Sequence, residues 1–273
     1  MLILAGTPIG NIGDASARLV STLQQAEVIA AEDTRTLLKL ANLLGIKLNA
    51  ELISLNEQNE LQKLDRLVEI ASTGNLVLVS DAGMPTISDP GFALVRACGE
   101  AGVEIQVVPG PSSVIAALAV SGLSTDRFSF EGFIPRKSGE RKKFFQKFVS
   151  ETRTMIFFES PHRVSESLAD AANIFGGKRQ ASLSRELTKK FEETLRGSLA
   201  ELFEQAKDLK GEMVLVVAGA KQTQMVASDL VDKVLELRAA GSSLKDAART
   251  IASKYGASTS ELYDLALKSN HSS

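Results

Sequence analysis

The chain has 273 residues, of which 44% are hydrophobic and 23% are charged, and its formal net charge is −2. This length indicates two domains, with or without a small appendage, and a core large enough to exclude a fold that depends on disulfide bonds. Cys98 is the only cysteine, and no apolar run approaches the roughly 18 residues of a membrane span. We therefore expect a cytoplasmic protein without a signal peptide and without membrane contact.

Strand-like and helix-like patterns alternate through the first 110 residues. Short apolar runs predict strands at Leu2–Ala5, Glu27–Ala30, Leu52–Leu55, Leu76–Val79 and Ile105–Val108. Apolar residues at helical spacing predict helices near Ser16–Gln24, Thr36–Leu44, Asn56–Ala71 and Pro90–Ala101. This alternation is typical of right-handed βαβ units, so we predict a largely parallel sheet. A small, apolar helix over Ser112–Ser121 completes a first α/β domain at residues 1–121.

The pattern restarts in a second α/β domain, predicted for residues 122–222. Its expected strands are Phe128–Phe130, Met155–Phe158, Ala181–Ser184, Phe191–Arg196 and Met213–Val217, and its expected helices lie near 138–150, 161–174 and 198–207. Because the strands follow one another closely after residue 180, we predict a mixed sheet with an antiparallel part.

Residues 223–273 predict a third, helical domain. One amphipathic helix is expected around Leu230–Leu235, and capping residues predict two more, opened by Ser243 with Asp246 and by Ser258 with Glu261. Three short helices in this arrangement resemble a helix-turn-helix, so the domain could be a reader of nucleic acid or an appendage that only packs. The mixed outward charges favour a packing appendage over a reader of nucleic acid.

The loops after the predicted strands hold most of the special chemistry, and open α/β sheets bind ligands at such loops. Ser80–Gly91 carries two carboxylates, two glycines and two prolines. In Gly6–Asp14 the glycines do not fit the dinucleotide fingerprint, and Pro8 removes an amide that a phosphate would need. This second loop suits a nucleoside held by main-chain contacts, or a turn that only connects strand and helix.

Two further loops combine carboxylates with cations. In Ala31–Arg35, adjacent acids and an arginine suit acid–base chemistry, a substrate clamp or a self-contained ion pair, with Asp33 also a good helix N-cap. In Phe158–Arg163, His162 stands between Glu159 and Arg163, which favours a functional over a structural histidine. Ser112 and Ser113 form another candidate, whose alternative role is helix capping. One cysteine and no H-x-x-x-H pattern predict no metal site.

Six motifs then occur in a fixed order: Gly6–Asn11, Ala31–Arg35, Ser80–Gly91, Val108–Ser112, Phe158–Arg163 and Lys210–Glu212. Together they resemble the tetrapyrrole-methylase superfamily over residues 1–220, and within it the branch of 16S rRNA (cytidine-2′-O)-methyltransferases. The resemblance implies the class III methyltransferase fold, with S-adenosylmethionine (SAM) in a cleft between two α/β domains. It places cofactor contacts at Ile9, Asp81, Met84, Ser113, Val114 and Ala218. The chain departs from the pattern at Asn56–Glu60, where relatives often carry histidines.

The resemblance also implies an activity: 2′-O-methylation of the cytidine ribose at position 1402 of 16S rRNA, within the 30S subunit, by a homodimer that does not bind DNA. A tetrapyrrole-type small-molecule methyltransferase and a non-catalytic rRNA-binding protein are the alternatives. The candidate general bases, at or beside predicted strand ends, are Asp33, Glu159, His162 and Lys189.

Arginine forks and a basic helix are the candidates for contact with RNA phosphates. They are Arg35, Arg163, Arg185, Arg141 and Lys142. The alternative for the basic helix is a surface helix whose Phe144, Phe145 and Phe148 face the core.

Overall fold

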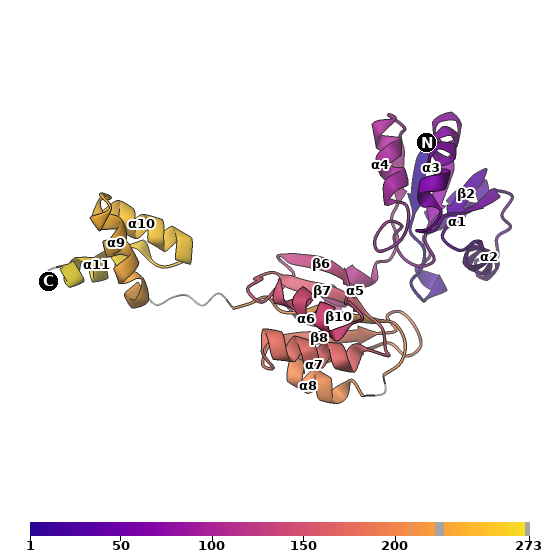
Figure 1. The fold of residues 1–273 in the computed structure, drawn as a ribbon. Coiled ribbons are helices and arrows are strands. Elements are labelled where there is room, and N and C mark those ends of the chain that lie inside the picture. The colour runs from indigo at the N-terminus through magenta and orange to yellow at the C-terminus, as the bar shows by residue number, and fades with distance from the viewer. Residues whose placement is uncertain (208, 222–226, 271–273) are drawn as a thin grey trace. The chain divides into compact units, whose positions relative to one another are not determined.

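The computed structural model describes residues 1–207, 209–221 and 227–270, and the chain divides into two compact units, Met1–Ala220 and Lys221–Ser273 (Figure 1). Within those described residues, no helix combines the length and the apolar character needed to cross a bilayer. Each unit is described by itself.

A largely parallel first sheet was predicted, and every strand pair in it is parallel, with strand order β3-β2-β4-β1-β5. Its strands are β1 Leu2–Ala5, β2 Val28–Ala31, β3 Glu51–Ser54, β4 Leu76–Val79 and β5 Ile105–Val108. Helices α1 (Ala17–Gln25) and α2 (Thr34–Leu43) share a core with one face of the sheet. Helices α3 (Glu60–Thr73) and α4 (Phe92–Glu100) share a core with the other face. We call this part, residues 1–112, the first lobe.

Helix α4 begins later than predicted, and Pro90 lies outside it. Gly91 occupies the N-cap position and offers no side-chain cap. Instead, Glu60 at the start of α3 reaches across, and its Oε1 accepts hydrogen bonds from the backbone N–H groups of Gly91, Ala93 and Leu94 at 2.9–3.2 Å. A carboxylate at a helix N-terminus is favoured by the helix dipole, so a long-range contact fixes this boundary.

The second sheet is mixed, also as predicted, with order β6-β7-β10-β8-β9. Its strands are β6 Phe128–Phe133, β7 Thr154–Glu159, β8 Gln180–Arg185, β9 Glu193–Ser198 and β10 Met213–Val217. Only β6 and β7 pair in parallel; β7–β10, β10–β8 and β8–β9 are antiparallel. Helices α6 (Ser138–Gln146), α7 (Val164–Phe175) and α8 (Leu199–Gln205) cover one face around Phe145 and Phe157.

Helix α5 (Ser113–Ser121) covers the other face of this second sheet. Its Val114, Ala117 and Leu118 pack with Val214 and Val216 of β10, because small side chains let the helix approach the strands closely. The sequence predicted the domain boundary after residue 121, which assigns α5 to the first domain. In the structure, α5 packs against the second sheet. We call residues 113–220 the second lobe.

The C-terminal unit contains the three predicted helices, preceded by a short 3₁₀ turn at Ala227–Leu230. They are α9 Val231–Ala239, α10 Leu244–Tyr255 and α11 Thr259–Asn270, and they enclose their own small core. The Ser243 hydroxyl caps α10 by accepting from the N–H of Asp246, at 3.1 Å, and it donates to the Asp246 carboxylate at 2.6 Å. The predicted Ser243 cap is present. In a full capping box the Asp246 side chain would accept from the backbone N–H of Ser243, but here it accepts from the Ser243 hydroxyl. Residues 223–226 and His271 lie outside the described residues.

Candidate functional site

The carboxyl ends of the parallel strands bring three motif loops together in the first lobe. The loops after β1 and β4 cross, and Thr7 and Gly83 exchange two backbone hydrogen bonds of 2.9 and 3.1 Å. The loop after β5 lies against the same place, because a Cβ atom built on Gly110 would meet the backbone of Gly6 at 2.7 Å. Backbone contact this close requires glycine at both positions.

Replacing Gly110 by Ala should therefore force two loops apart. We expect the free energy of unfolding to fall by about 1–3 kcal/mol, the usual cost of inserting a methyl group into packed structure. Gly99→Ala is the matched control, since Gly99 lies within α4 and a Cβ there meets nothing within 4 Å. The control should gain about 0.5–1 kcal/mol from helix propensity. Urea unfolding measures both, and equal midpoints for the two variants would contradict the packing described.

A hollow of about 410 Å³ lies where these loops face the second lobe. Such a volume is in the range of small-molecule sites. The first lobe contributes Ile9, Ala82 and Asp89, and the second contributes residues of α5, β6, the end of β7 and the start of β10. A smaller hollow of about 70 Å³ shares Ala82, Asp89, Ser113 and Phe158 with it. Its further lining residues are Gly83, Met84, Ile87, Ser112 and Val114.

The two lobes touch beside this hollow. The N–H of Asn11 donates to the Oγ1 of Thr188 at 3.1 Å, and Gly10 packs so closely on Lys189 that a Cβ would meet its side chain at 2.5 Å. Thr188 has φ of +66°, and Thr86 in the loop after β4 has φ of +74°. Such angles are rare for β-branched residues and are concentrated at functional sites, so the strain supports a functional reading of both loops.

Four of the six residues predicted to contact SAM line these hollows: Ile9, Met84, Ser113 and Val114. The structure does not bring the other two to them. The Asp81 carboxylate instead accepts a hydrogen bond from the N–H of Asp33 at 3.1 Å, which ties the loops after β2 and β4 together. Ala218 follows the far end of β10, whereas the hollow is lined by Glu212, Met213 and Val214 at the start of that strand.

The residues present fit a bound nucleoside-like cofactor. Ile9, Met84 and Val114 supply apolar walls, while Ser113 opens helix α5 at the hollow. Ser112 stands at the N-cap position without a side-chain cap, so the capping alternative is not what the structure shows. The first N–H groups of a helix are natural donors to a ligand oxygen.

Asp33 and Lys189 have shifted pKa values that make both of them poor general bases. Asp33 caps α2 and forms a fork with Arg35 at 2.6 and 3.0 Å, and this hydrogen bonding lowers the pKa of Asp33 to about 2. The interpretation as a self-contained ion pair and N-cap is therefore supported. For Lys189, burial acts to lower the pKa, but hydrogen bonds to Glu212 and Glu186, at 2.8 and 3.1 Å, outweigh it and raise the pKa. A lysine that holds its proton this firmly is a poor base.

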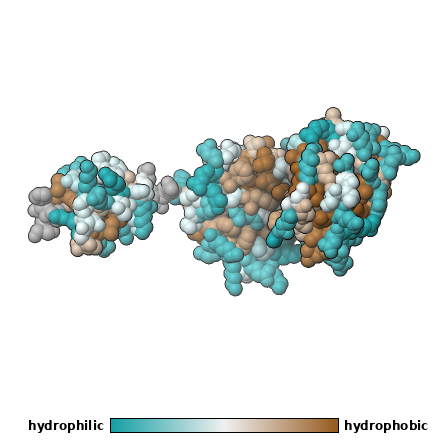
Figure 2. Space-filling view, turned by 90° about the horizontal axis from the view of Figure 1, so that it is seen from above, coloured by the Kyte–Doolittle hydropathy of each residue, from teal (hydrophilic) through white to brown (hydrophobic). Residues whose placement is uncertain are grey.

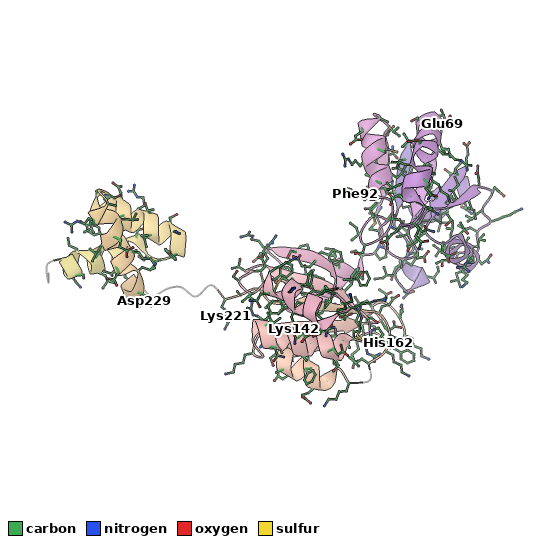
Figure 3. All side chains as sticks on the ribbon, viewed as in Figure 1. Glu69, Phe92, Lys142, His162, Lys221 and Asp229 are labelled. Carbon is green, nitrogen blue, oxygen red and sulfur yellow. The ribbon has the colours of Figure 1, made fainter. Side chains whose placement is uncertain are left out.

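Of the other two candidates, Glu159 lines the larger hollow but is fully engaged by its neighbours, and His162 lies outside both hollows. Glu159 has no exposed side-chain surface; its Oε1 accepts from Ser160 N–H and pairs with Arg163, each at 2.7 Å, and its Oε2 accepts from the Ser167 hydroxyl. Every oxygen of this carboxylate is engaged. His162 is exposed on the turn before α7 and does not line either hollow (Figure 3).

Asp89 was not singled out from the sequence, where it appears only as one of the two carboxylates of Ser80–Gly91. Asp89 lines both hollows and is half-buried. Burial, reinforced by the negative charges of Glu32 and Asp81, raises the pKa of Asp89 to about 6. Because Asp81 and Asp89 lie in one loop with similar neighbours, only the fold distinguishes them. Within residues 1–207, 209–221 and 227–270, no three His, Cys, Asp or Glu side chains gather as metal ligands.

The five cations predicted to contact RNA fall into two groups, those with largely buried side chains and those with exposed side chains. The structure does not favour Arg141 as a phosphate contact, because its side chain is only 2% exposed and forms ion pairs with Asp170 at 2.7 Å and Glu166 at 3.3 Å. Arg163 is paired with buried Glu159, and Arg185 pairs with Glu193 across β8 and β9 at 2.7 Å. Their guanidinium groups have partners within the protein.

Two of the predicted cations remain well exposed. The Arg35 side chain is 84% exposed and that of Lys142 54%. Lys142 lies on the surface of α6 (Figure 3), whose Phe145 is fully buried and whose Phe144 packs against the same core, together with Phe148 just beyond the helix. The alternative of a surface helix with its aromatic residues turned inward therefore holds for α6.

Comparisons with known proteins agree with the fold. The family model of tetrapyrrole (corrin/porphyrin) methylases matches residues 1–203. Among solved structures, the methyltransferase CobJ covers 80% of this chain and 94% of its own with a TM-score of 0.61 at 19% identity. Uroporphyrin-III C-methyltransferase from Thermus thermophilus, solved with S-adenosyl homocysteine, covers 80% and 96% with a TM-score of 0.56 at 17% identity. At such identities these structures show a shared fold.

Curated relatives are much more similar in sequence. "Ribosomal RNA small subunit methyltransferase I" of Mycobacterium tuberculosis (strain CDC 1551 / Oshkosh) is 45% identical over 271 residues, covering 98% of this chain and 95% of the relative. The protein of the same name from Escherichia coli O157:H7 is 43% identical over 274 residues, covering 98% and 94%. With a family model that spans most of the chain and relatives this similar along nearly its whole length, the chain belongs to the tetrapyrrole (corrin/porphyrin) methylase family.

Proposed function

We propose that this protein is a SAM-dependent methyltransferase whose substrate is the RNA of the small ribosomal subunit. This proposal rests on the sequence identity between the chain and its rRNA methyltransferase relatives along nearly the whole chain. Two rRNA methyltransferase relatives are 45% and 43% identical over 98% of the chain, whereas the methyltransferase CobJ and uroporphyrin-III C-methyltransferase are 19% and 17% identical over 80%. The higher sequence identity supports the rRNA branch of the family over the tetrapyrrole branch.

The finer proposal follows the resemblance of the motifs. The acceptor is the 2′-hydroxyl of the cytidine at position 1402, offered within the 30S subunit, and the protein acts in the cytoplasm. A homodimer is supported by apolar residues exposed at two sheet edges: Ile105 and Val107 of β5, 37% and 49% exposed, and Phe128 of β6, 39% exposed. Unpaired edges of this kind favour association. Figure 2 shows apolar surface, in brown, among the polar side chains of residues 1–220.

The proposed division of labour uses the residues that line the hollows. SAM supplies an electrophilic methyl group when it is bound. Ile9, Met84 and Val114 would enclose its apolar parts, and Ser113 would offer hydrogen bonds at the start of α5. Asp81 remains a predicted SAM contact. In the structure its carboxylate ties the loop after β4 to the loop after β2. The protein gains rate by holding the ribose hydroxyl in line with the methyl carbon and by excluding water.

We further propose that Asp89 accepts the proton of the attacking hydroxyl. Of Asp33, Glu159, His162 and Lys189, only Glu159 lines a hollow, and both oxygens of its carboxylate are already engaged by neighbouring side chains and backbone. Asp89 lines both hollows, and its raised pKa of about 6 makes it a stronger base than an ordinary aspartate while leaving it ionised at pH 7. Arg35 and Lys142 remain the predicted phosphate contacts with the most exposed side chains.

Transfer of a labelled methyl group separates the three candidate functions. The protein would be incubated with labelled SAM and, in parallel, with 30S subunits, naked 16S rRNA and uroporphyrinogen III. We expect label in the rRNA of at least one RNA sample and none in the tetrapyrrole. Label in the tetrapyrrole alone would establish the small-molecule alternative. RNA binding without transfer of label would establish a non-catalytic RNA-binding protein.

A further inference from the structure

Phe133 is an exposed aromatic residue that also lines the larger hollow. Among the described residues that line this hollow, Phe133 is the one large hydrophobic residue that is exposed, at 60%. Phe92 is similarly exposed, at 69%, but it lies on α4 and lines neither hollow (Figure 3).

The backbone of β6 is shaped to present this ring. The pairing of β6 with β7 shifts register between Phe130 and Phe133, and Gly132 between them has φ of +74°. An extra residue in a strand redirects the side chains that follow it, and such irregularities are frequent beside active sites. The pairing resumes at once, because the N–H of Ile134 donates to Phe158 O at 3.1 Å.

The ring is also held in place from beneath. Phe133 meets Phe158 edge to face, with ring centroids 5.2 Å apart, and Phe158 meets Phe130 in the same way at 4.8 Å. Phe158 itself lines both hollows. This row of three rings fixes Phe133 while most of its surface stays in contact with solvent, which is the arrangement of a stacking platform.

Positive charge follows directly along the chain. Arg136 and Lys137 are exposed three and four residues after Phe133. The intervening segment is anchored, since the Arg163 Nη1 donates to Ile134 O at 3.3 Å. Exposed cations beside an exposed ring match the two needs of a single-stranded nucleotide, a π surface for its base and counter-charge for its phosphates.

Resting on the proposed function, we infer that Phe133 stacks on a nucleobase of the RNA substrate, splayed out of its helix so that the adjoining ribose reaches the hollow. A ribose hydroxyl within a folded RNA is accessible to a recessed site only when its nucleotide leaves the stack. Proteins commonly hold such nucleotides by stacking the base on an aromatic ring. Phe133 is thus a substrate-binding residue, separate from the proposed cofactor contacts.

The test compares Phe133→Ala and Phe133→Leu with Phe133→Trp, and uses Phe92→Ala as the control. Loss of base stacking should lower kcat/KM for the RNA about 5- to 150-fold in the Ala and Leu variants. The Trp variant and the control should stay within about twofold of the wild type. SAM affinity, measured by calorimetry, should be unchanged in all four. Loss of SAM affinity in parallel with kcat/KM would instead make Phe133 a cofactor wall and overturn the inference.

A second measurement does not depend on turnover. Equilibrium binding of a 16S rRNA fragment at several salt concentrations should show weaker binding by Phe133→Leu with an unchanged salt dependence, because no phosphate contact is removed. Lys137→Ala should do the reverse and lower the salt slope by about one. Equal RNA affinity of wild type and Phe133→Leu would overturn the inference even if methyl transfer is confirmed. Absence of methyl transfer by the wild type would overturn the proposed function instead.

Discussion

Asp89→Asn should slow methyl transfer by about 10²–10⁴-fold, the usual contribution of a general base. The amide keeps the shape of the carboxyl group but cannot accept the proton of the attacking hydroxyl. SAM affinity should change little, so the loss appears in single-turnover rates with saturating SAM. Asp65→Asn, on the exposed surface of α3, is a matched control and should keep the wild-type rate.

The pH dependence identifies Asp89 more specifically. Burial raises the pKa of Asp89 to about 6, and the base acts only when ionised. The wild-type rate should therefore rise with pH up to about 6 and then level off, and this inflection should disappear in Asp89→Asn. A variant that retains both the rate and the inflection would show that Asp89 is not the base.

The same group should cost stability at neutral pH. A carboxyl whose folded pKa lies above its unfolded value binds its proton more tightly in the folded state, so its contribution to stability falls as pH rises from about 4 through about 6. At pH 7 the ionised form opposes folding, and Asp89→Asn should melt at a higher temperature than the wild type. Reduced activity with increased stability is the pattern expected of a strained functional group.

Arg141→Ala should destabilise the second lobe by about 3–5 kcal/mol, the cost of breaking a buried ion pair by removing one partner. Arg141 is 1% exposed, and its Nε lies 2.7 Å from the Oδ2 of Asp170. Lys142→Ala is the neighbouring control: its ammonium is 3.5 Å from Asp170 and its side chain is 54% exposed, so it should cost less than about 1 kcal/mol.

Urea unfolding followed by far-ultraviolet circular dichroism measures this loss. Both tyrosines, Tyr255 and Tyr263, belong to the C-terminal unit, so tyrosine fluorescence follows that unit separately and should not change. The double variant Arg141→Met with Asp170→Leu removes both charges and should recover most of the stability. An Arg141→Ala protein of normal stability but weakened RNA binding would restore the original prediction of a phosphate contact.

Lowering the pH should weaken the ion pair between Arg141 and Asp170 over a pH range that the pKa of Asp170 sets. Burial acts to raise the pKa of Asp170, but the hydrogen bond and charge of Arg141 outweigh it, and the net effect lowers the pKa. The pair therefore stabilises the fold above the ordinary pKa of an aspartate, and this stability is lost as pH falls through the lowered value.

The strands and the sheet types were predictable because they depend on local patterns. The strands Leu2–Ala5, Leu76–Val79, Ile105–Val108 and Met213–Val217 have the predicted bounds, and apart from Gln106 they consist of apolar residues. Four predicted SAM contacts also line the hollows, because the carboxyl ends of parallel strands must meet at one edge.

The chemistry of individual groups was not predictable, because it depends on partners distant in sequence. Glu60 caps a helix that starts some thirty residues later. Lys189 is held by Glu212, and Arg141 by Asp170. Asp89 and Phe133 owe their positions to crossing loops and to a register shift, for which the sequence carries no periodic signal.

The position of the methyl group in the product tests the central claim most directly. RNA from 30S subunits treated with the protein and labelled SAM would be hydrolysed in alkali, which cannot cleave the bond that follows a 2′-O-methylated ribose. The proposed function predicts label in an alkali-stable dinucleotide whose first nucleoside is cytidine. Label in mononucleotides, which would mean methylation of a base, or no label in RNA would contradict it.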